Sequence, residues 1–422
     1  MAGLLLSSLA AYGVADAAAA YTLELGAGGS DNIRRVATQP VSEGIATAGL
    51  EVSWTETRER LDGDLLVDLD YRSYLDNTYD DRVLGTADGS FVFGLVPGRF
   101  TWLLQDSFGQ AQSDPFAVAT PDTQENLNYA TTGPDLTFRF GSASALRLFG
   151  RYSITDYERS LLDSDRVSAG FAVGRPFAAG RELMLNAMRE DISFDDAAQA
   201  GYKRDNLYLS YRLDGGRTDV SVEAGYSWLD RDVGDETSGA LLRVSVIRSL
   251  SASTALDLSF GTELTDSSDS LRQLAGGAGR ISPGAVTGTS APLTTRFADL
   301  AWNFNRNRTG FGFGVSWNDD SYEDQASLDR DRWVYSAHLD RQLSRTLTAS
   351  IASSFTDDRY SATGAEATEW MNAGSLSWAF GRHFGLQLRL ENFDRSTSTR
   401  LGEYRENRGF LTLFYRSGPD RR

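Results

Sequence analysis

Residues 206–231 read NLYLSYRLDGGRTDVSVEAGYSWLDR, and the fold can be predicted by working outward from this stretch. Apolar Leu207, Leu209 and Tyr211 alternate with more polar neighbours as far as Arg212. A polar turn follows at 214–217, and the alternation then resumes and continues to Trp228. Since successive side chains of a strand point to opposite faces, the stretch predicts a β-hairpin with one continuous apolar face.

The same pattern recurs at 136–154, 302–317 and 376–390, and the connections between expected strands alternate in length. Short connections lie near 61–63, 97–98, 141–144, 176–180, 214–217, 249–253, 305–308, 341–345 and 381–383. Longer ones lie near 29–43, 73–82, 111–126, 158–165, 192–202, 232–237, 267–289, 320–331, 359–366 and 395–403. Short turns on one side and longer loops on the other are typical of bacterial outer-membrane barrels.

We therefore predict an all-β fold, a transmembrane antiparallel up-and-down β-barrel with short periplasmic turns and longer extracellular loops. Counting the expected strands gives about 20, and roughly 16 to 20 are compatible with the pattern. No Pro/Ser-rich linker or shift of composition divides the 422 residues. Residues 21–422 are therefore expected to form a single barrel domain.

The first 20 residues predict export. An apolar run at 4–11 is followed by small residues that end before Tyr21, as in a secretory signal peptide, although Met1–Gly3 lack the usual basic start. The chain contains no cysteine, which suits an oxidising periplasm. We expect the mature chain in the outer membrane of a Gram-negative bacterium.

Tryptophans and prolines provide a further test of the barrel. Amphipathic rings prefer the membrane–water boundaries, so a barrel predicts two aromatic girdles. The girdle near the short turns would contain Trp54, Trp102, Trp302 and Trp378, and that near the long loops Trp228, Trp317, Trp333 and Trp370. All nine prolines, Pro134 included, are expected in connections or at strand starts, because proline has no N–H to donate.

The residues that alternate with the apolar ones along each expected strand are predicted to line the lumen. The basic members of this set are Arg139, Arg147, Arg151, Arg166, Arg212, Arg243 and Arg389, and its acidic members are Glu51, Asp68, Asp70, Glu223, Asp257, Glu263 and Glu391. A lumen of both signs suits a water-filled pore that orients polar solutes. The arginines at 139–151 have two interpretations: ion pairs across neighbouring strands, which we favour, or a track that selects anions.

A barrel of this size leaves an aqueous channel unless loops fold inward. The segment 271–292, rich in Gly, Ala and Ser, is long enough to fold in as a constriction. It could equally remain an ordinary mobile surface loop, and this second interpretation is slightly favoured.

The net charge of −17 argues against a nucleic-acid partner, since phosphates require basic patches. Much of the acid lies in expected loops, where solvated loops are the favoured interpretation and divalent-cation or lipopolysaccharide bridging is the alternative.

Catalysis is poorly supported because His338 and His383 are the only histidines. A Ser-His-acid site would need His338 as its base, and a structural role in the lumen is favoured for it. Without cysteine or paired histidines a transition-metal site is not expected either. We predict no enzyme, no catalytic residues, no metal site and no cofactor.

One region contains more specific sequence motifs, at residues 105–110 (QDSFGQ), 114–116 (DPF), 120–122 (TPD), 125–129 (ENLNY) and 132–135 (TGPD). It resembles the outer-membrane β-barrel family encoded with exopolysaccharide and exosortase (PEP-CTERM) systems. The resemblance implies a porin-like outer-membrane barrel that acts as a conduit or accessory for surface polysaccharide. It supplies no catalytic residues.

Three functions are consistent with the sequence. The leading one is an outer-membrane channel for exopolysaccharide export or for passive diffusion of polar solutes. Its partners would be outer-membrane lipids, lipopolysaccharide, polysaccharide and periplasmic export components. The alternation of apolar and polar residues does not define the oligomeric state. The second is a plugged barrel with an adhesin, structural or enzymatic role. The third is a soluble β-propeller that binds carbohydrate, because hairpins repeating every ~40 residues also suit propeller blades.

Overall fold

The computed structural model describes residues 18–114, 116–141, 144–270, 287–323, 325–398 and 402–417. They form one 20-stranded antiparallel sheet, with a short helical stretch at 267–270 and the 3-10 turn η1 (Ala326–Leu328) in two of its connections. The strands are β1 (Ala18–Ser30), β2 (Glu43–Arg58), β3 (Leu61–Tyr74), β4 (Arg82–Val96), β5 (Phe100–Gln112), β6 (Gln124–Phe140), β7 (Ser144–Tyr157), β8 (Ser164–Ala178), β9 (Arg181–Phe194), β10 (Tyr202–Gly215), β11 (Thr218–Arg231), β12 (Thr237–Ser251), β13 (Thr254–Thr265), β14 (Leu293–Arg306), β15 (Thr309–Tyr322), β16 (Arg330–Gln342), β17 (Leu347–Tyr360), β18 (Ala365–Ala379), β19 (Phe384–Thr397) and β20 (Tyr404–Ser417).

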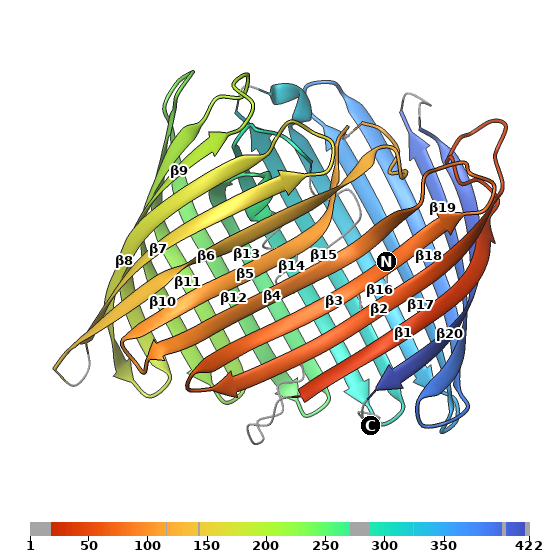
Figure 1. The fold of residues 1–422 in the computed structure, drawn as a ribbon, viewed down its shortest axis with the longest axis horizontal. Helices are drawn as coiled ribbons and strands as arrows, with labels where there is room; N and C mark the ends of the chain where they lie inside the picture. Colours follow the sequence, from red (N-terminus) through yellow and green to blue (C-terminus); the bar gives the residue numbers. More distant parts are fainter. Residues whose placement is uncertain are drawn as a thin grey trace.

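Each strand pairs with its neighbour in sequence, and the first strand pairs with the last. The β1–β20 ladder runs from Tyr21 opposite Ser417 to Ser30 opposite Arg408, so the sheet closes on itself without an edge. Figure 1 shows the tilted strands around the barrel, with short turns at the bottom and longer loops at the top. Closure into one barrel contradicts the β-propeller alternative, because a propeller consists of separate four-stranded sheets.

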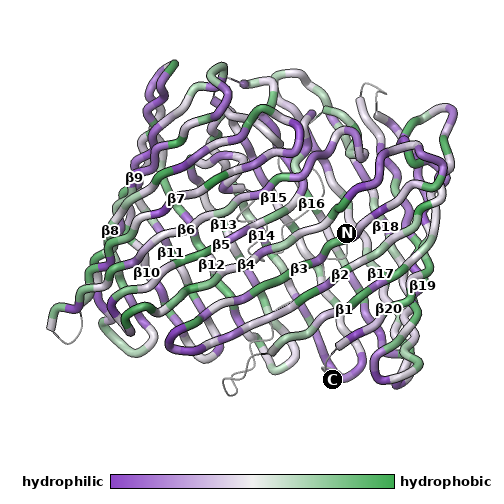
Figure 2. The backbone as a smooth tube through the Cα atoms, viewed as in Figure 1, coloured by the Kyte–Doolittle hydropathy of each residue, from purple (hydrophilic) through white to green (hydrophobic). Residues whose placement is uncertain are grey.

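The outward face of the barrel is apolar. On the hairpin of β10 and β11, Leu207 and Leu209 point outward with exposed fractions of 44% and 50%, whereas Asn206 and Ser227 are buried inside. The alternation of apolar and polar residues is visible along the strands in Figure 2. A closed barrel leaves no unpaired backbone groups facing lipid, so this architecture can span a bilayer. The described residues therefore form a closed β-barrel whose outward face suits the hydrocarbon of a bilayer.

Aromatic rings gather at both ends of the outward face. Near the long loops, Trp317 contacts Trp333, and a chain of ring contacts continues through Tyr335 and Phe355 to Trp370. Near the short turns, the outward tryptophans with ring contacts are Trp54, Trp302 and Trp378. The two remaining predicted girdle residues, Trp102 and Trp228, also point outward. In the part of the chain that the structure describes, no helix is long and apolar enough to cross a membrane.

Two prolines do not lie where the sequence predicts them, in a connection or at a strand start. Pro176 lies near the end of β8, beside a register shift in the β8–β9 ladder. Pro134 is the larger departure. It lies well inside β6, and the β6–β7 ladder is interrupted there, between the pairs Thr132–Tyr152 and Asp135–Phe149. The Arg151 side chain occupies the break, since its Nη1 donates to the carbonyl oxygens of Pro134 at 3.0 Å and Gly150 at 2.8 Å. A side-chain donor therefore stabilises a position at which proline has no N–H.

Strand β1 begins at Ala18, opposite Thr55 of β2. The predicted leader therefore overlaps the barrel at residues 18–20, and the rest of it, residues 1–17, lies outside the described residues.

Candidate functional site

The candidate site is the inner wall of the barrel together with the loop segments that fold into its outer mouth. By the ladder registers, all the predicted lining residues have the parity opposite to that of the outward-pointing apolar side chains of their strands. For example, Glu223 of β11 lies opposite Arg243 of β12, and Glu51 of β2 lies opposite Asp68 of β3. A role for these residues in conduction stays a prediction.

Several of the predicted charges form ion pairs along the wall. Arg243 Nη1 lies 2.9 Å from Glu223, and its Nη2 pairs with Glu263. Arg389 Nε lies 2.7 Å from Glu391 on the same strand.

The wall also carries an acidic strip on β1–β4. Glu51 and Asp68 face each other directly, and Asp70 lies two residues along β3 with Arg72 paired to it at 2.8 Å. Other inward carboxylates of the strip belong to Glu24, Asp64 and Asp88. Like charges directly opposite each other destabilise a strand pair unless solvent screens them.

A second wall region, on β6 and β7, is basic. Arg151 Nη2 lies 2.7 Å from Asp135 Oδ2, and Arg147 Nε lies 3.7 Å from Asp135 Oδ1. One carboxylate thus serves two guanidinium groups. Arg139 is exposed on the same inner face, one step diagonally from Arg147.

The outer mouth is narrowed by the connection between β13 and β14. Its first residues, Asp266 to Ser270, fold across β11 and β12 to the inner face of β7–β10, where Asp266 and Asp269 are 5% and 4% exposed. At the other end of the connection, Thr287 forms a parallel bridge with Gln112 of β5. The favoured interpretation of 271–292 as a surface loop is therefore wrong for residues 287–291, which lie against the barrel wall; residues 271–286 lie outside the described residues.

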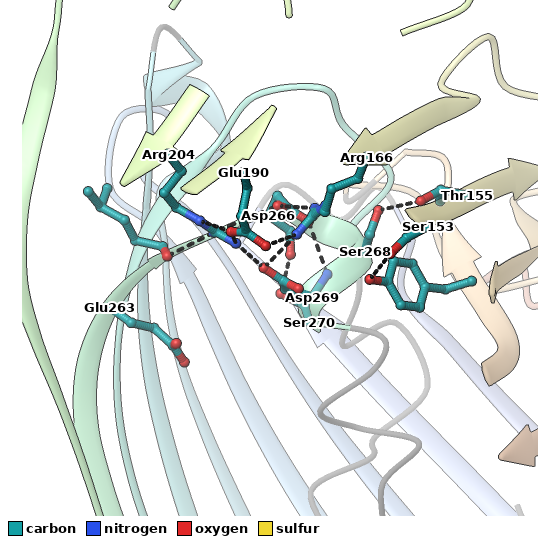
Figure 3. Close-up of polar contacts among 12 residues, drawn as sticks. Ser153, Thr155, Arg166, Glu190, Arg204, Glu263, Asp266, Ser268, Asp269 and Ser270 are labelled. Atoms are coloured by element: carbon teal, nitrogen blue, oxygen red, sulfur yellow. Dashed lines mark hydrogen bonds and ion pairs between the residues drawn. The ribbon is translucent and has the colours of Figure 1, made fainter. Parts of the chain in front are cut away.

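A buried ionic network fastens this connection to the wall (Figure 3). Arg166 of β8 lies 2.6 Å from Asp266 and 3.1 Å from Asp269. Arg204 of β10 lies 2.5 Å from both Asp269 and Glu190. These five side chains, which we call the loop anchor, are 4–7% exposed. Removing charges from water is costly, but here each guanidinium has at least two carboxylate partners.

The β5–β6 connection folds inward from the opposite side. Phe116 packs on Tyr360 of β17 with ring centroids 4.7 Å apart, and Val118 packs in a cluster with Met371, Phe393 and Tyr404 of β18–β20. This connection carries part of the sequence that resembles the exopolysaccharide-associated family, the segments 114–116 and 120–122.

Arg35 joins the β1–β2 connection to the same cluster. Its Nη1 donates to the carbonyl oxygen of Ala119 at 2.8 Å, and its Nε lies 2.9 Å from Glu406. Burial alone lowers the pKa of the guanidinium, but Tyr404 and Glu406 beside it raise the pKa above its ordinary value. Arg35 therefore stays charged at every accessible pH.

The two histidines lie at separate places in the barrel. His338 lies on the inner wall of β16 and covers Gly312, where a Cβ would be 2.1 Å from its Cε1. His383 lies in the β18–β19 turn, and its Nδ1 is 2.8 Å from the carbonyl oxygen of Arg416. Among the described residues no group of three or more acidic or histidine side chains is placed to hold a metal ion.

The sequence pattern missed most of the loop anchor. Arg166 was predicted to face the lumen, and Glu190 and Arg204 carry the same parity, so periodicity could have identified them. Asp266 and Asp269 have no such signal, because periodicity ends where the strand ends.

Solved structures share this fold, whereas no protein-family model and no curated protein matches the chain. The siderophore receptor PirA from Acinetobacter baumannii aligns over 96% of this chain and 81% of that chain, with 8% identity and a TM-score of 0.50. The ferric enterobactin receptor PfeA from Pseudomonas aeruginosa covers 96% and 81%, with 9% identity and a TM-score of 0.48. OccK2 (OpdF) from the same species, solved with glucuronate, covers 95% and 98%, with 12% identity and a TM-score of 0.40. At such identities the likeness shows the fold alone.

Proposed function

We propose that this chain is an outer-membrane channel for passive diffusion of polar solutes. The observation that carries the proposal is the charge on the inner wall below the loop anchor. Glu51 lies opposite Asp68, and Arg147 and Arg243 keep 51% and 40% of their side-chain surface exposed. Facing carboxylates and exposed guanidinium groups require water around them, so they support an aqueous lumen.

A finer proposal concerns the solute. The resemblance at 105–135 supports a conduit or accessory role in exopolysaccharide export, with periplasmic export components as partners. Outer-membrane lipids and lipopolysaccharide would surround the apolar outer face, and its long-loop end carries the outward carboxylates of Asp165, Asp331 and Asp357.

The second candidate is a plugged barrel with an adhesin, structural or enzymatic role. It is favoured by the inward course of the β5–β6 and β13–β14 connections: Val118 of the first packs on the inner wall, and the described residues of the second are mostly buried at the outer mouth. Barrels of more than 20 strands with a filled lumen are known, so strand number alone does not separate the two functions.

Current recordings in a planar lipid bilayer distinguish the channel from the plugged barrel. The full chain is refolded and its folding checked by a heat-dependent shift in gel migration; single-channel currents are then recorded with and without an acidic polysaccharide. We expect steady conductance, which the polymer blocks if export is the task. Conductance without block supports the diffusion channel alone. Silence from folded, inserted protein contradicts the channel and favours the plugged barrel.

A further inference from the structure

We propose that Arg147 and Phe149, with Arg139 beside them, form a subsite on the inner wall that binds anionic sugars. The proposal rests on the proposed channel function, because it concerns solutes that enter the lumen. It names a substrate class, sugars that carry a carboxylate, for which the wall offers both a charge and a flat apolar surface.

The availability of Arg147 is the first observation. Of the two guanidinium groups around Asp135, that of Arg151 uses both terminal nitrogens within the wall, because Nη2 pairs with Asp135 and Nη1 donates to the carbonyls of Pro134 and Gly150. Arg147 has a loose contact of 3.7 Å with Asp135 and keeps 51% of its side chain exposed. A guanidinium in this state can form a bidentate pair with a carboxylate of a solute.

The placement of Phe149 is the second observation. Phe149 lies directly opposite Gly170 of β8, and a Cβ at Gly170 would be 2.5 Å from the Cζ of the ring. The absence of a side chain at 170 therefore lets the ring lie across the neighbouring strand. The guanidinium carbons of Arg147 and Arg151 are 5.6 Å and 5.5 Å from the ring centroid.

The third observation is local charge. In the short-turn half of β6 and β7, the inner face carries Arg139, Arg147 and Arg151 against Asp135, while the other inward carboxylate of β6, Glu125, lies at the long-loop end and accepts hydrogen bonds from Arg159 N–H and Ser160. No carboxylate among the described residues lies within ion-pair distance of Arg139. The whole chain has a net charge of −17, so this group of arginines is positive within a protein that is acidic overall.

These observations together select the ligand. The charge alone would attract any small anion, and an aromatic ring alone would favour any apolar surface. A pyranose with a carboxylate satisfies both at once, since its C–H face can pack on the ring while its carboxylate pairs with Arg147. Galacturonate is a suitable probe, because galactose has the same ring without the charge and acetate has the charge without the ring.

The test records single-channel currents of the full chain with each probe. We expect galacturonate to interrupt the current at concentrations at which galactose and acetate do not. Arg147→Gln should weaken the block about tenfold, as expected for the loss of a charge-assisted pair of about 1.4 kcal/mol. Phe149→Leu should weaken the galacturonate block while leaving any effect of acetate unchanged.

Arg389→Gln is the matched control, since it removes the same charge from the inner wall on β19. An equal loss of block in Arg389→Gln and Arg147→Gln would overturn the subsite, because it would assign the effect to the general field of the lumen. Equal block by acetate and galacturonate would overturn the sugar part of the proposal.

If the folded protein does not conduct, the channel function fails but the subsite can still be tested. Calorimetric titration of the detergent-solubilised barrel with galacturonate then decides. Binding that Arg147→Gln weakens supports the subsite, and the absence of binding to the wild-type chain overturns it.

Discussion

Gly85 in β4 shows how one residue can set the local path of the barrel wall. Its φ of +121° lies in a region that side chains rarely adopt, and a Cβ would be 2.0 Å from the carbonyl oxygen of Asp68. Gly85→Ala should therefore lower the free energy of unfolding by about 2 kcal/mol, measured by urea titration in detergent. Gly374→Ala is the control, since nothing lies within 4 Å of the position that a Cβ would take there, and the φ of Gly374 is ordinary. A similar loss in both variants would contradict this account.

Glu190 is the wall carboxylate that contacts both arginines of the loop anchor. Glu190→Gln should lower the free energy of unfolding by about 3 kcal/mol, because buried guanidinium groups lose a charged partner. The same urea titration measures it. Glu182→Gln, on the inner face at the other end of β9, should cost much less because Glu182 is only half-buried. Equal losses of unfolding free energy in both variants would show that the loop anchor stabilises the barrel no more than any other inward carboxylate does.

At the scale of elements, the chain without cysteine offers a direct test of the inward loop. Gln112 and Thr287 are bridge partners, so the double variant Gln112→Cys/Thr287→Cys should form a disulfide on mild oxidation. Mass spectrometry of the proteolysed chain would detect the linked peptides. The pair Ser361→Cys/Thr287→Cys, with Ser361 in the β17–β18 connection, should remain reduced. A disulfide in the control but not in the first pair would contradict the described course of the loop.

The strands themselves could be predicted well because each carries its own signal. The alternation of Leu207 and Leu209 with Arg212 depends only on which side of the sheet meets lipid, and the structure bears it out. Pro134 was misplaced because a donor from another strand, Arg151, stabilises it, and single-strand patterns contain no such information. The same reason explains the loop anchor: Asp269 and Arg204 are 65 residues apart, and they meet only because the connection after β13 folds back across β12 and β11 to β10.

At the scale of the whole molecule, the two aromatic girdles predict how the barrel sits in a bilayer. All eight tryptophans lie near one end or the other of the strands. Lipids brominated close to the headgroup should therefore quench tryptophan emission more strongly than lipids brominated near the chain ends. The measurement uses the full chain in vesicles, with the detergent-solubilised barrel as the unquenched reference. Stronger quenching by the deeper bromines would contradict the two-girdle arrangement.

The fold class and the strand number could be predicted at this scale, since about 20 strands were expected and 20 are present. Closure follows from pairing rules that every strand obeys. The transported solute could not be predicted as the fold could. Its choice depends on a few side chains such as Arg147 and not on a repeated pattern.

The inward connections also have a mechanical consequence. A thin-walled hollow cylinder yields most easily by flattening into an oval, whereas a crossbar between distant parts of its rim resists that deformation. The segment at Phe116 to Ala119 ties β5 and β6 to β17–β20, and the segment at Asp266 to Asp269 ties β13 to β8 and β10. The rim at the long-loop end is thus held in two directions, so lateral pressure should deform the short-turn end of the wall first.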